Sequence, residues 1–239
     1  MFKNSRFLTR PLYLQVRDTL VQRIVLGEWK PGVAFPNEFN LSQELGVSPG
    51  TVRKALDQLE QEMIVVRKQG RGTFVNDQSS SEMAIRFSRI VSPEGLRIEG
   101  RIVQRHVERG PANEMEAGRL GLGRGQHVIR IDRLHLYRDR PFMIERAWLP
   151  EHVFPVRPDP VGSYKICVIA QANQVFLKSA RETVRPVLPT VEEAGEFGIP
   201  ASEPIVELER TIITLDDRPI EWRIARCALG ELRYVSEIA

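Results

Sequence analysis

Apolar residues recur at spacings of three and four along two stretches in the first third of the chain. The first stretch starts at Pro11, stops near Gly27, and contains Leu12, Val16, Leu20, Ile24 and Val25. The second contains Val52, Ala55, Leu56, Leu59 and Met63. This spacing places the apolar side chains of each stretch on one face of a helix. We therefore predict two amphipathic helices, with a shorter helix around Leu41 and Leu45 between them.

The polar positions of the second stretch are unevenly charged. Its N-terminal end presents Ser48, Gly50, Thr51, Arg53 and Lys54, whereas its C-terminal half has Asp57, Glu60 and Glu62. Only the start of this helix can therefore face DNA, as in a recognition helix whose first residues contact base edges. A basic hairpin follows, with Arg67, Lys68 and Arg71 around a glycine-rich turn at 69–72. The pattern predicts a DNA-binding winged helix-turn-helix.

Residues 11–75 resemble the DNA-binding domain of the GntR family of bacterial transcription regulators. The blocks that match are Pro31-Gly32, Phe35-Pro36-Asn37-Glu38, Leu45-Gly46-Val47-Ser48, Thr51-Val52-Arg53-Lys54-Ala55-Leu56 and Gly70-Arg71-Gly72-Thr73-Phe74-Val75. The chain departs from the family at Phe39, where an arginine is frequent, and at Pro49-Gly50, where polar or basic residues are common. With the charge pattern, the resemblance implies DNA contacts by Asn37, Glu38, Ser48, Gly50, Thr51, Arg53, Lys54, Gln69, Gly70 and Arg71.

The net charge is +3, and all of the excess lies in residues 1–78, where 11 Lys and Arg face 8 Asp and Glu. This excess is too small to indicate nucleic-acid binding by itself. Two cysteines, Cys167 and Cys227, do not make a disulfide framework in 239 residues. We find no signal peptide and no run of about 20 apolar residues that could span a membrane. We expect a cytoplasmic protein with no membrane partner.

A polar, serine-rich stretch at 77–83 separates two regions of apolar periodicity and predicts a linker. We expect a winged helix-turn-helix at 1–76 and a second domain at 84–239. In the second domain, apolar alternation predicts strands at 98–107, 127–137, 141–149, 175–187, 204–215 and 219–228. Helices are expected at 112–120, at 162–173 with Ser163 as its cap, and at 190–197.

Two of the predicted hairpins have similar sequences. IDRLHLYRDRPFMIERAW at 131–148 and LERTIITLDDRPIEWRIA at 208–225 share an acid-Arg pair, an Asp-Arg-Pro turn and a following glutamate. The similarity suggests related hairpins in one antiparallel sheet, with Arg133 comparable to Arg210 and Glu145 to Glu221. The alternative is that the two segments are similar by coincidence, because Asp and Pro are both favoured in the turns of hairpins.

Residues 84–239 resemble the UTRA effector-binding domain of the HutC subfamily of GntR regulators. The matching motifs are Gly121-Leu122-Gly123, Arg133, Pro141 to Glu145, Leu149-Pro150, Ser163-Tyr164, Arg210, Pro219-Ile220-Glu221 and Tyr234. The resemblance implies an α+β protein whose second domain is an α/β sandwich of the chorismate-lyase type with a mainly antiparallel sheet. It also implies a homodimer and a small metabolite bound between the sheet and the helices.

The resemblance places effector-binding residues at Arg133, Glu145, Ser163, Tyr164 and Glu221. Arg181, Thr183 and Arg185 share one face of a predicted strand, so Arg181 or Arg185 could project into the same pocket. Arginines beside carboxylates suit an anionic or zwitterionic ligand, because guanidinium groups bind carboxylate or phosphate in bidentate fashion. Cys227 stands where the family often has an aromatic residue or arginine, which puts sugar phosphates in doubt. The alternative for each residue is a solvated surface ion pair.

Enzymatic chemistry finds little support in the sequence. The four histidines show no metal-ligand spacing, and the glycine-rich 121–125 leads into a strand and not into a helix. We expect no metal, no cofactor and no catalytic residue. We predict a transcriptional regulator that acts as a repressor. It binds an inverted-repeat operator in double-stranded DNA and responds to a small effector. Two alternatives stay open: a lyase-like enzyme in the second domain, and a non-specific DNA-binding protein.

Overall fold

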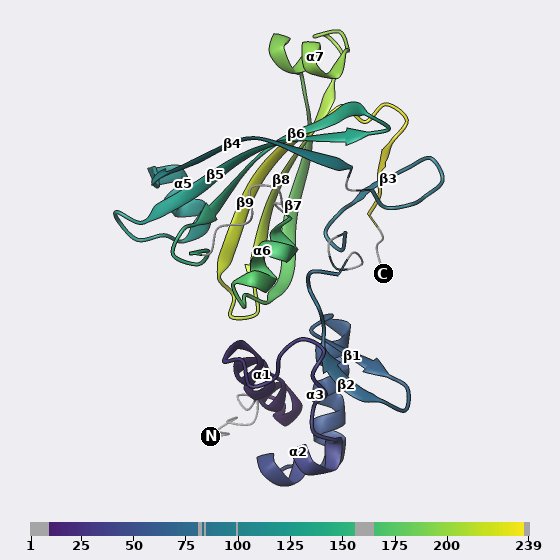
Figure 1. Ribbon diagram of the computed structural model, residues 1–239, viewed down its shortest axis with the longest axis vertical. Helices are drawn as coiled ribbons and strands as arrows, with labels where there is room; N and C mark the ends of the chain where they lie inside the picture. The colour runs from purple at the N-terminus through teal and green to yellow at the C-terminus, as the bar shows by residue number, and fades with distance from the viewer. Residues whose placement is uncertain (1–9, 81–82, 84, 99, 156–164, 237–239) are drawn as a thin grey trace, which may run out of the picture. The chain divides into compact units, whose positions relative to one another are not determined.

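The computed structural model describes residues 10–80, 83, 85–98, 100–155 and 165–236. The chain divides into two compact units, Met1–Asp77 and Gln78–Ala239 (Figure 1). The first is mainly helical and the second is built on an antiparallel sheet, so the predicted α+β class is confirmed.

The first unit is a three-helix core with a hairpin. Its elements are α1 (Leu12–Val25), α2 (Glu38–Leu45), α3 (Pro49–Gln61), β1 (Val65–Lys68) and β2 (Gly72–Val75). Most of the predicted apolar stripes form the core, in which Leu20, Ile24, Leu41, Val52 and Leu59 are completely buried. Leu12 and Val25, at the two ends of α1, depart from the prediction and are 51% and 37% exposed. Burial of these faces holds the short helices together, since helices of this length are marginal alone. The predicted winged helix is confirmed.

Local capping fixes where α2 and α3 begin. The side chain of Asn37 accepts a hydrogen bond from the backbone N–H of Asn40, and that of Ser48 accepts one from Thr51. Gly46 ends α2 in the left-handed conformation, which glycine adopts without steric cost. Met63 departs from the prediction: it lies beyond the end of α3 with φ 56° and is 50% exposed, so it is outside the buried stripe.

The second unit contains one six-stranded sheet, all antiparallel, in the order β4-β5-β6-β9-β8-β7. The strands are β4 (Arg101–Pro111), β5 (His127–Tyr137), β6 (Arg140–Pro150), β7 (Leu177–Val187), β8 (Ile205–Thr214) and β9 (Pro219–Cys227). The helices are α5 (Glu114–Leu120), α6 (Ile166–Ala172) and α7 (Val191–Phe197), and β3 (Ile90–Val91) pairs with β10 (Arg233–Tyr234). The first strand of the sheet begins three residues later than predicted.

The similarity of the two hairpins extends to a repeat of larger size. Each half of the sheet follows the order strand, short helix, strand, strand: β4-α5-β5-β6 and β7-α7-β8-β9. Both helices start with a capping box, Asn113 with Glu116 and Thr190 with Glu193, and both end at a left-handed glycine. The halves meet at the β6–β9 pair in the middle of the sheet.

Cross-strand pairing corrects one detail of the predicted repeat. Arg133 and Arg210 do occupy comparable positions, on β5 and β8. However, Arg133 pairs with Glu145, whereas Arg210 pairs with Arg223, and Glu221 pairs with Ile212. The counterpart of Glu145 is therefore Arg223. Glu221 lies two residues after Pro219, whereas Glu145 lies four residues after Pro141. The two glutamates therefore do not occupy equivalent positions in the sheet, although the hairpin sequences are similar.

Two apolar clusters cover opposite ends of one sheet face. Ile166, Ile169 and Ala170 of α6 pack against a cluster that includes Ile131 and Leu149. The other cluster joins Ile90 near the start of the unit to Met143, Leu208, Ala225 and Leu232. The charged residues described below lie on this face too. On the opposite face, Trp148 stacks on Trp222 with ring centroids 4.1 Å apart.

Candidate functional sites

The first candidate site is the start of α3. Ser48, Gly50, Arg53 and Lys54 are exposed there, and Thr51 is half-buried. Ser48 and Thr51 are also tied to each other, with their hydroxyl oxygens 2.9 Å apart. These groups cap the helix and still present oxygens to solvent, so they could also contact a phosphate at the helix N-terminus.

Arg53 is held by Glu38 across the helix-turn-helix. Its Nε and Nη2 atoms lie 2.9 Å and 2.8 Å from Glu38 Oε2. The Arg53 side chain is 65% exposed, and its hydrogen bond to Glu38 raises the pKa of the guanidinium, which stays charged. The pair fixes the direction of Arg53 but leaves most of it open to a nucleic acid. Asn37, beside Glu38, uses its side chain to cap α2.

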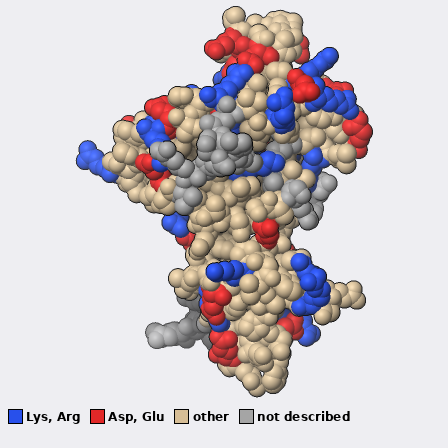
Figure 2. Space-filling view, viewed as in Figure 1, with Lys and Arg blue, Asp and Glu red and all other residues tan. Residues whose placement is uncertain are grey.

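The acidic half of α3 has partners within the first unit. Arg67 on β1 lies 2.5 Å from Asp57 and 3.0 Å from Glu60, and Glu62 pairs with Arg17 of α1. Acidic side chains lie among the basic ones on the face drawn in Figure 2. Arg67 therefore joins the hairpin to α3. Because its guanidinium is already paired with these carboxylates, Arg67 is a poor candidate for contact with a phosphate.

The hairpin tip is the second part of this surface. Gln69, Gly70 and Arg71 are exposed, and Gly70 has φ 68°, a conformation that a side chain would strain. Lys68 lies over the ring of Phe74 at 5.1 Å from its centroid. All ten residues predicted to bind DNA lie at the start of α2, at the start of α3 or at the hairpin tip. None of them belongs to the core.

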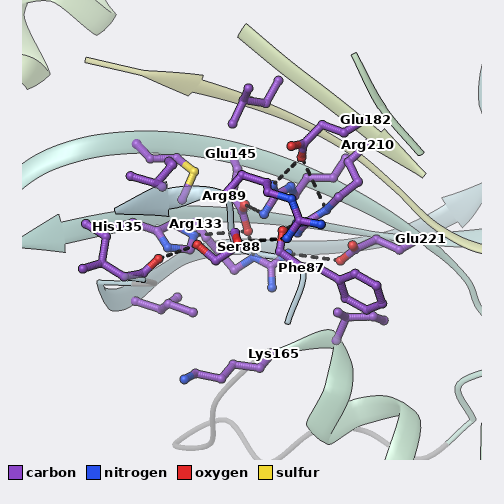
Figure 3. A pocket seen from close by; sticks show the side chains of 17 residues that line it. Phe87, Ser88, Arg89, Arg133, His135, Glu145, Lys165, Glu182, Arg210 and Glu221 are labelled. Carbon is purple, nitrogen blue, oxygen red and sulfur yellow. Dashed lines mark hydrogen bonds and ion pairs between the residues drawn. The ribbon is translucent and has the colours of Figure 1, made fainter. Parts of the chain in front are cut away.

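The second candidate site is a cavity of about 60 Å³ in the second unit (Figure 3). It lies over the middle of the sheet face, between the two apolar clusters, and is closed by residues 87–90 and by the start of α6. Three arginines, three glutamates and a histidine are directed into it: Arg133, Arg210, Arg223, Glu145, Glu182, Glu221 and His135. Arg89 and Lys165 also line it.

Glu145 is the centre of this cluster and is only 2% exposed. Its carboxylate oxygens lie 2.5 Å from Arg133 Nε and 2.9 Å from Arg223 Nη1. His135 Nε2 lies 3.2 Å from the same group. Burial by itself would raise the pKa of Glu145, but Arg133 and Arg223 outweigh this effect and hold the pKa well below its usual range. Glu145 is therefore ionised and fully paired.

The other two carboxylates are much less satisfied. Glu221 Oε1 lies 3.6 Å from Arg133 Nη2, and Glu182 Oε2 lies 3.6 Å from Arg223 Nη2, both too long for hydrogen bonds. The Oε2 atoms of Glu182 and Glu221 are buried and accept no hydrogen bond from the described residues. Buried acceptors without donors are rare in native proteins, and a ligand is one explanation for them.

Arg210 is almost fully buried and donates a hydrogen bond from Nη1 to the carbonyl of Phe87, 2.7 Å away. Burial lowers the pKa of Arg210, and the like charge of Arg223 acts in the same direction. Glu182 receives a hydrogen bond of 2.9 Å from the Tyr234 hydroxyl, and burial with this carboxylate raises the pKa of Tyr234 to about 12.

Arg133, Glu145 and Glu221 thus meet in the cavity, but other predicted effector-binding residues do not. Arg181 and Arg185 are exposed, and Arg185 pairs with Glu207. The register of β7 shifts between Leu177 and Ser179, which turns Glu182 inward in place of Arg181. Ser163 and Tyr164 lie outside the described residues. The helix expected from residue 162 begins at Ile166, after Lys165.

Four members of the cluster were missing from the predicted site: Glu182, Arg210, Arg223 and His135. Arg210 could have been found through its equivalence to Arg133 in the repeated hairpin. Arg223 follows Glu221 by two residues and so shares its strand face, which is a usable signal. Glu182 depends on the shift in β7, and no pattern in the sequence marks that shift.

No group of three or more His, Cys, Asp or Glu residues that could hold a metal ion occurs within the described part of the chain. Both cysteines are buried, and burial raises the pKa of the Cys227 thiol to about 12. Among the described helices, none has the length and apolar character needed to cross a membrane.

Family models match both units. The model of the UTRA domain matches residues 98–231, and the model of bacterial regulatory proteins of the gntR family matches residues 12–75. The chain therefore belongs to the GntR family of bacterial regulatory proteins and has a UTRA domain.

Curated relatives support the same assignment along nearly the whole chain. The Mannosyl-D-glycerate transport/metabolism system repressor MngR of Escherichia coli is 26% identical over 89% of this chain and 90% of its own length. The transcriptional repressor NagR of Bacillus subtilis is 29% identical over 84% of each chain. PhnF from Mycobacterium smegmatis has a similar fold, with a TM-score of 0.55, 22% identity and coverage of 94% and 99% of the two chains.

The protein is a transcriptional regulator of the repressor type that binds DNA and a small-molecule effector, and it is not an enzyme. The predicted family, fold class and function are confirmed. The assignment to the HutC subfamily stays a prediction.

Proposed function

We propose that this protein is a one-component repressor of the HutC type, which acts as a homodimer on an inverted-repeat operator in the cytoplasm. The observation that supports it most is the exposed start of α3, where Glu38 fixes the direction of the exposed Arg53 side chain. Two such surfaces in a dimer would address two half-sites of one duplex.

In the first unit, we assign Arg53 and Lys54 to guanine edges or the phosphate backbone, and Ser48 and Thr51 to phosphates or base edges. Gln69, Gly70 and Arg71 are assigned to the minor groove or the backbone. Asn37 and Glu38 act indirectly in this proposal, since Asn37 caps α2 and Glu38 orients Arg53. The negative charge of Glu38 would repel the phosphate backbone, so binding by charge attraction alone is weakened. This repulsion favours selectivity for the correct sequence over high affinity for any sequence.

In the second unit, the effector occupies the charged cavity. Glu145 is already fully paired and serves as its scaffold, whereas Glu182 and Glu221 offer oxygens that need a donor. We therefore propose a ligand with amino or hydroxyl groups for these two carboxylates. Arg89 and Lys165 line the cavity as well and favour an anionic group elsewhere on the ligand. An anionic or zwitterionic metabolite meets both requirements. The name of MngR associates that relative with mannosyl-D-glycerate, a hydroxyl-rich anion.

A thermal-shift screen of the full chain tests the effector class. Matched probes are glucosamine 6-phosphate, glucose 6-phosphate, gluconate, lysine and succinate, the last of which has charge but no donor. We expect a probe with both an anionic group and donors to raise the melting temperature, and Glu221→Gln to remove the shift while the exposed control Glu203→Gln keeps it. Stabilisation by succinate as large as by the others would contradict the proposed role of Glu182 and Glu221.

Sedimentation equilibrium tests the proposed assembly. The full chain has a mass of 27.3 kDa, and we expect twice that mass at micromolar concentration. A single species of 27.3 kDa on and off DNA would exclude the homodimer. The DNA-binding part of the proposal would then need a separate explanation.

A further inference from the structure

The second unit begins with a buried glutamine. Gln78 is 3% exposed and directly follows Asp77, the last residue of the first unit. Its side-chain amide donates to the carbonyl of Val175 at 2.9 Å and accepts from the backbone N–H of Leu177 at 2.8 Å. The first residue after the DNA-binding unit is therefore fixed to the start of β7.

The helix α6 holds the same residue from another side. The backbone N–H of Gln78 donates to the side-chain oxygen of Gln171 at 3.2 Å. One turn earlier in α6, the Cys167 thiol donates to the carbonyl of Met83 at 3.3 Å. Thus α6 contacts the chain at two points just after the boundary between the units.

The opposite end of α6 reaches the effector cavity. Lys165 and Ile166, at its N-terminal end, line the cavity. Gln171 lies five positions after Ile166, a rise of about 7.5 Å at 1.5 Å per helical residue. A displacement of this two-turn helix at Ile166 would therefore also displace Gln171, whose side-chain oxygen accepts the hydrogen bond from Gln78.

A second route joins the cavity to the same stretch of chain. Arg210 donates to the carbonyl of Phe87, and Phe87, Ser88 and Arg89 line the cavity. Arg86, next to Phe87, donates to the carbonyl of Lys178 at 2.7 Å, close to the point where Gln78 is bound on β7. The first route ends at Gln78 itself, and the second ends at Leu177 and Lys178, of which Leu177 donates its backbone N–H to Gln78.

We infer that Gln78, held by α6 and by the start of β7, is the residue through which occupation of the cavity is transmitted to the DNA-binding unit. This inference rests on the proposed function and specifies how its effector site regulates DNA binding. Gln78 is a positioning residue in this role, since it contacts neither the cavity nor the DNA-binding surface. A ligand that displaces Ile166 or draws Arg210 from Phe87 changes how Gln78 is held, and coupling needs only such a differential contact.

A double-mutant cycle on operator affinity tests the inference without an identified effector. The probe is a duplex selected from a random pool by the purified full chain. Ile166→Ala removes packing at the cavity end of α6, and Gln78→Leu removes the hydrogen bonds at the other end. We expect each change to alter operator affinity, and the double mutant to differ from the product of the two effects by at least about threefold, as for residues coupled through a shared backbone shift.

The control pair combines Gln78→Leu with Leu120→Ala. Leu120 is 3% exposed in the apolar cluster of α5, on the other face of the sheet, so this pair should be additive. Gln171→Ala with Ile166→Val is a milder second cycle if the first variants fold poorly. Additive effects in both test cycles, with DNA binding intact, would overturn the inference and leave the proposed function standing. Failure of the parent chain to bind any selected duplex would instead contradict the proposed function.

Discussion

The two units use ion pairs of the same residue types in different ways. In the DNA-binding unit, Arg53 pairs with Glu38 at the surface, and its side chain is 65% exposed. In the effector unit, the Arg133 side chain pairs with Glu145 and is 4% exposed. A surface pair is screened by water and contributes little to stability, so it can be exchanged for a phosphate or a base. A buried pair is costly to break, because the remaining charge has no partner.

The surface pair can therefore take part in binding DNA, whereas the buried pair holds the fold of the second unit together. If Arg53 contacts DNA as we propose, it can exchange Glu38 for a phosphate or a base and pair with Glu38 again when the DNA is released. Glu145 cannot be exchanged in this manner, since it neutralises two buried arginines at once. Within the cavity, the residues free to respond to a ligand are those with long contacts, Glu182 and Glu221.

Removing the buried charge should have the largest effect. Glu145→Gln leaves Arg133 and Arg223 without their shared counter-charge, and breaking a buried pair in this way costs about 3–5 kcal/mol. We expect the free energy of unfolding of the second unit to fall by that amount in a urea titration of the full chain. Glu203→Gln, at an exposed position, is the matched control and should be neutral. Equal stability of the two variants would show that Glu145 is not the centre of the cluster.

The same carboxylate predicts a pH dependence. Because the folded-state pKa of Glu145 is lowered, its contribution is fully present above the unfolded-state value of about 4.3 and is lost as the pH falls toward the folded-state pKa. We expect the parent chain to lose stability below about pH 4.3, and Glu145→Gln to lose less over the same range. Urea titrations between pH 3 and pH 7 measure the difference. Parallel curves for the two proteins would contradict the assigned pKa direction.

Removing the exposed cation should affect function and leave the fold intact. Arg53→Ala should weaken operator binding by about tenfold, as expected for loss of one specific arginine contact. If the contact is to a phosphate, the slope of log affinity against log salt should also become shallower by about 0.9. Fluorescence anisotropy at several salt concentrations distinguishes the two cases. Arg101→Ala, an exposed arginine of the other unit, is the control.

The smallest predicted effect concerns the end of α3. The helices α2, α5 and α7 end at a glycine in the left-handed conformation, but α3 is followed by Met63 with φ 56°. Met63→Gly should relieve this strain and stabilise the first unit by about 0.5–1 kcal/mol. A higher urea midpoint for the first unit is the expected result. A lower midpoint would mean that the packing of Met63 outweighs its strain.

The elements of the first unit could be predicted because their causes are local. Spacing of Val52, Leu56 and Leu59 fixes the buried side of α3, and Ser48 fixes its start. The role of Arg67 could not be predicted from the same stretch, since it depends on β1 folding back onto α3 beside Asp57. Sequence showed a basic hairpin, and the structure shows that part of its charge is used internally.

The cavity was only partly predictable for a related reason. Arg133, Glu145 and Glu221 came from a family resemblance, while Glu182 and Arg223 depend on which strands lie side by side. Strand order and the irregular start of β7 are non-local, and a shift of one residue exchanges the two faces of a strand. Period-two alternation grouped Arg181 with Arg185 correctly but could not decide which way that face pointed.

We expect this chain to bind a defined DNA sequence through the start of α3. The most direct measurement is a competition titration of the full chain between a duplex that it selects from a random pool and a scrambled duplex of equal length and composition, at fixed salt. We expect the selected duplex to be preferred by at least about 1,000-fold, and this preference to fall about tenfold in Arg53→Ala if Arg53 contacts a base. Equal affinity for the two duplexes would rule out sequence-specific binding and favour a non-specific DNA-binding protein.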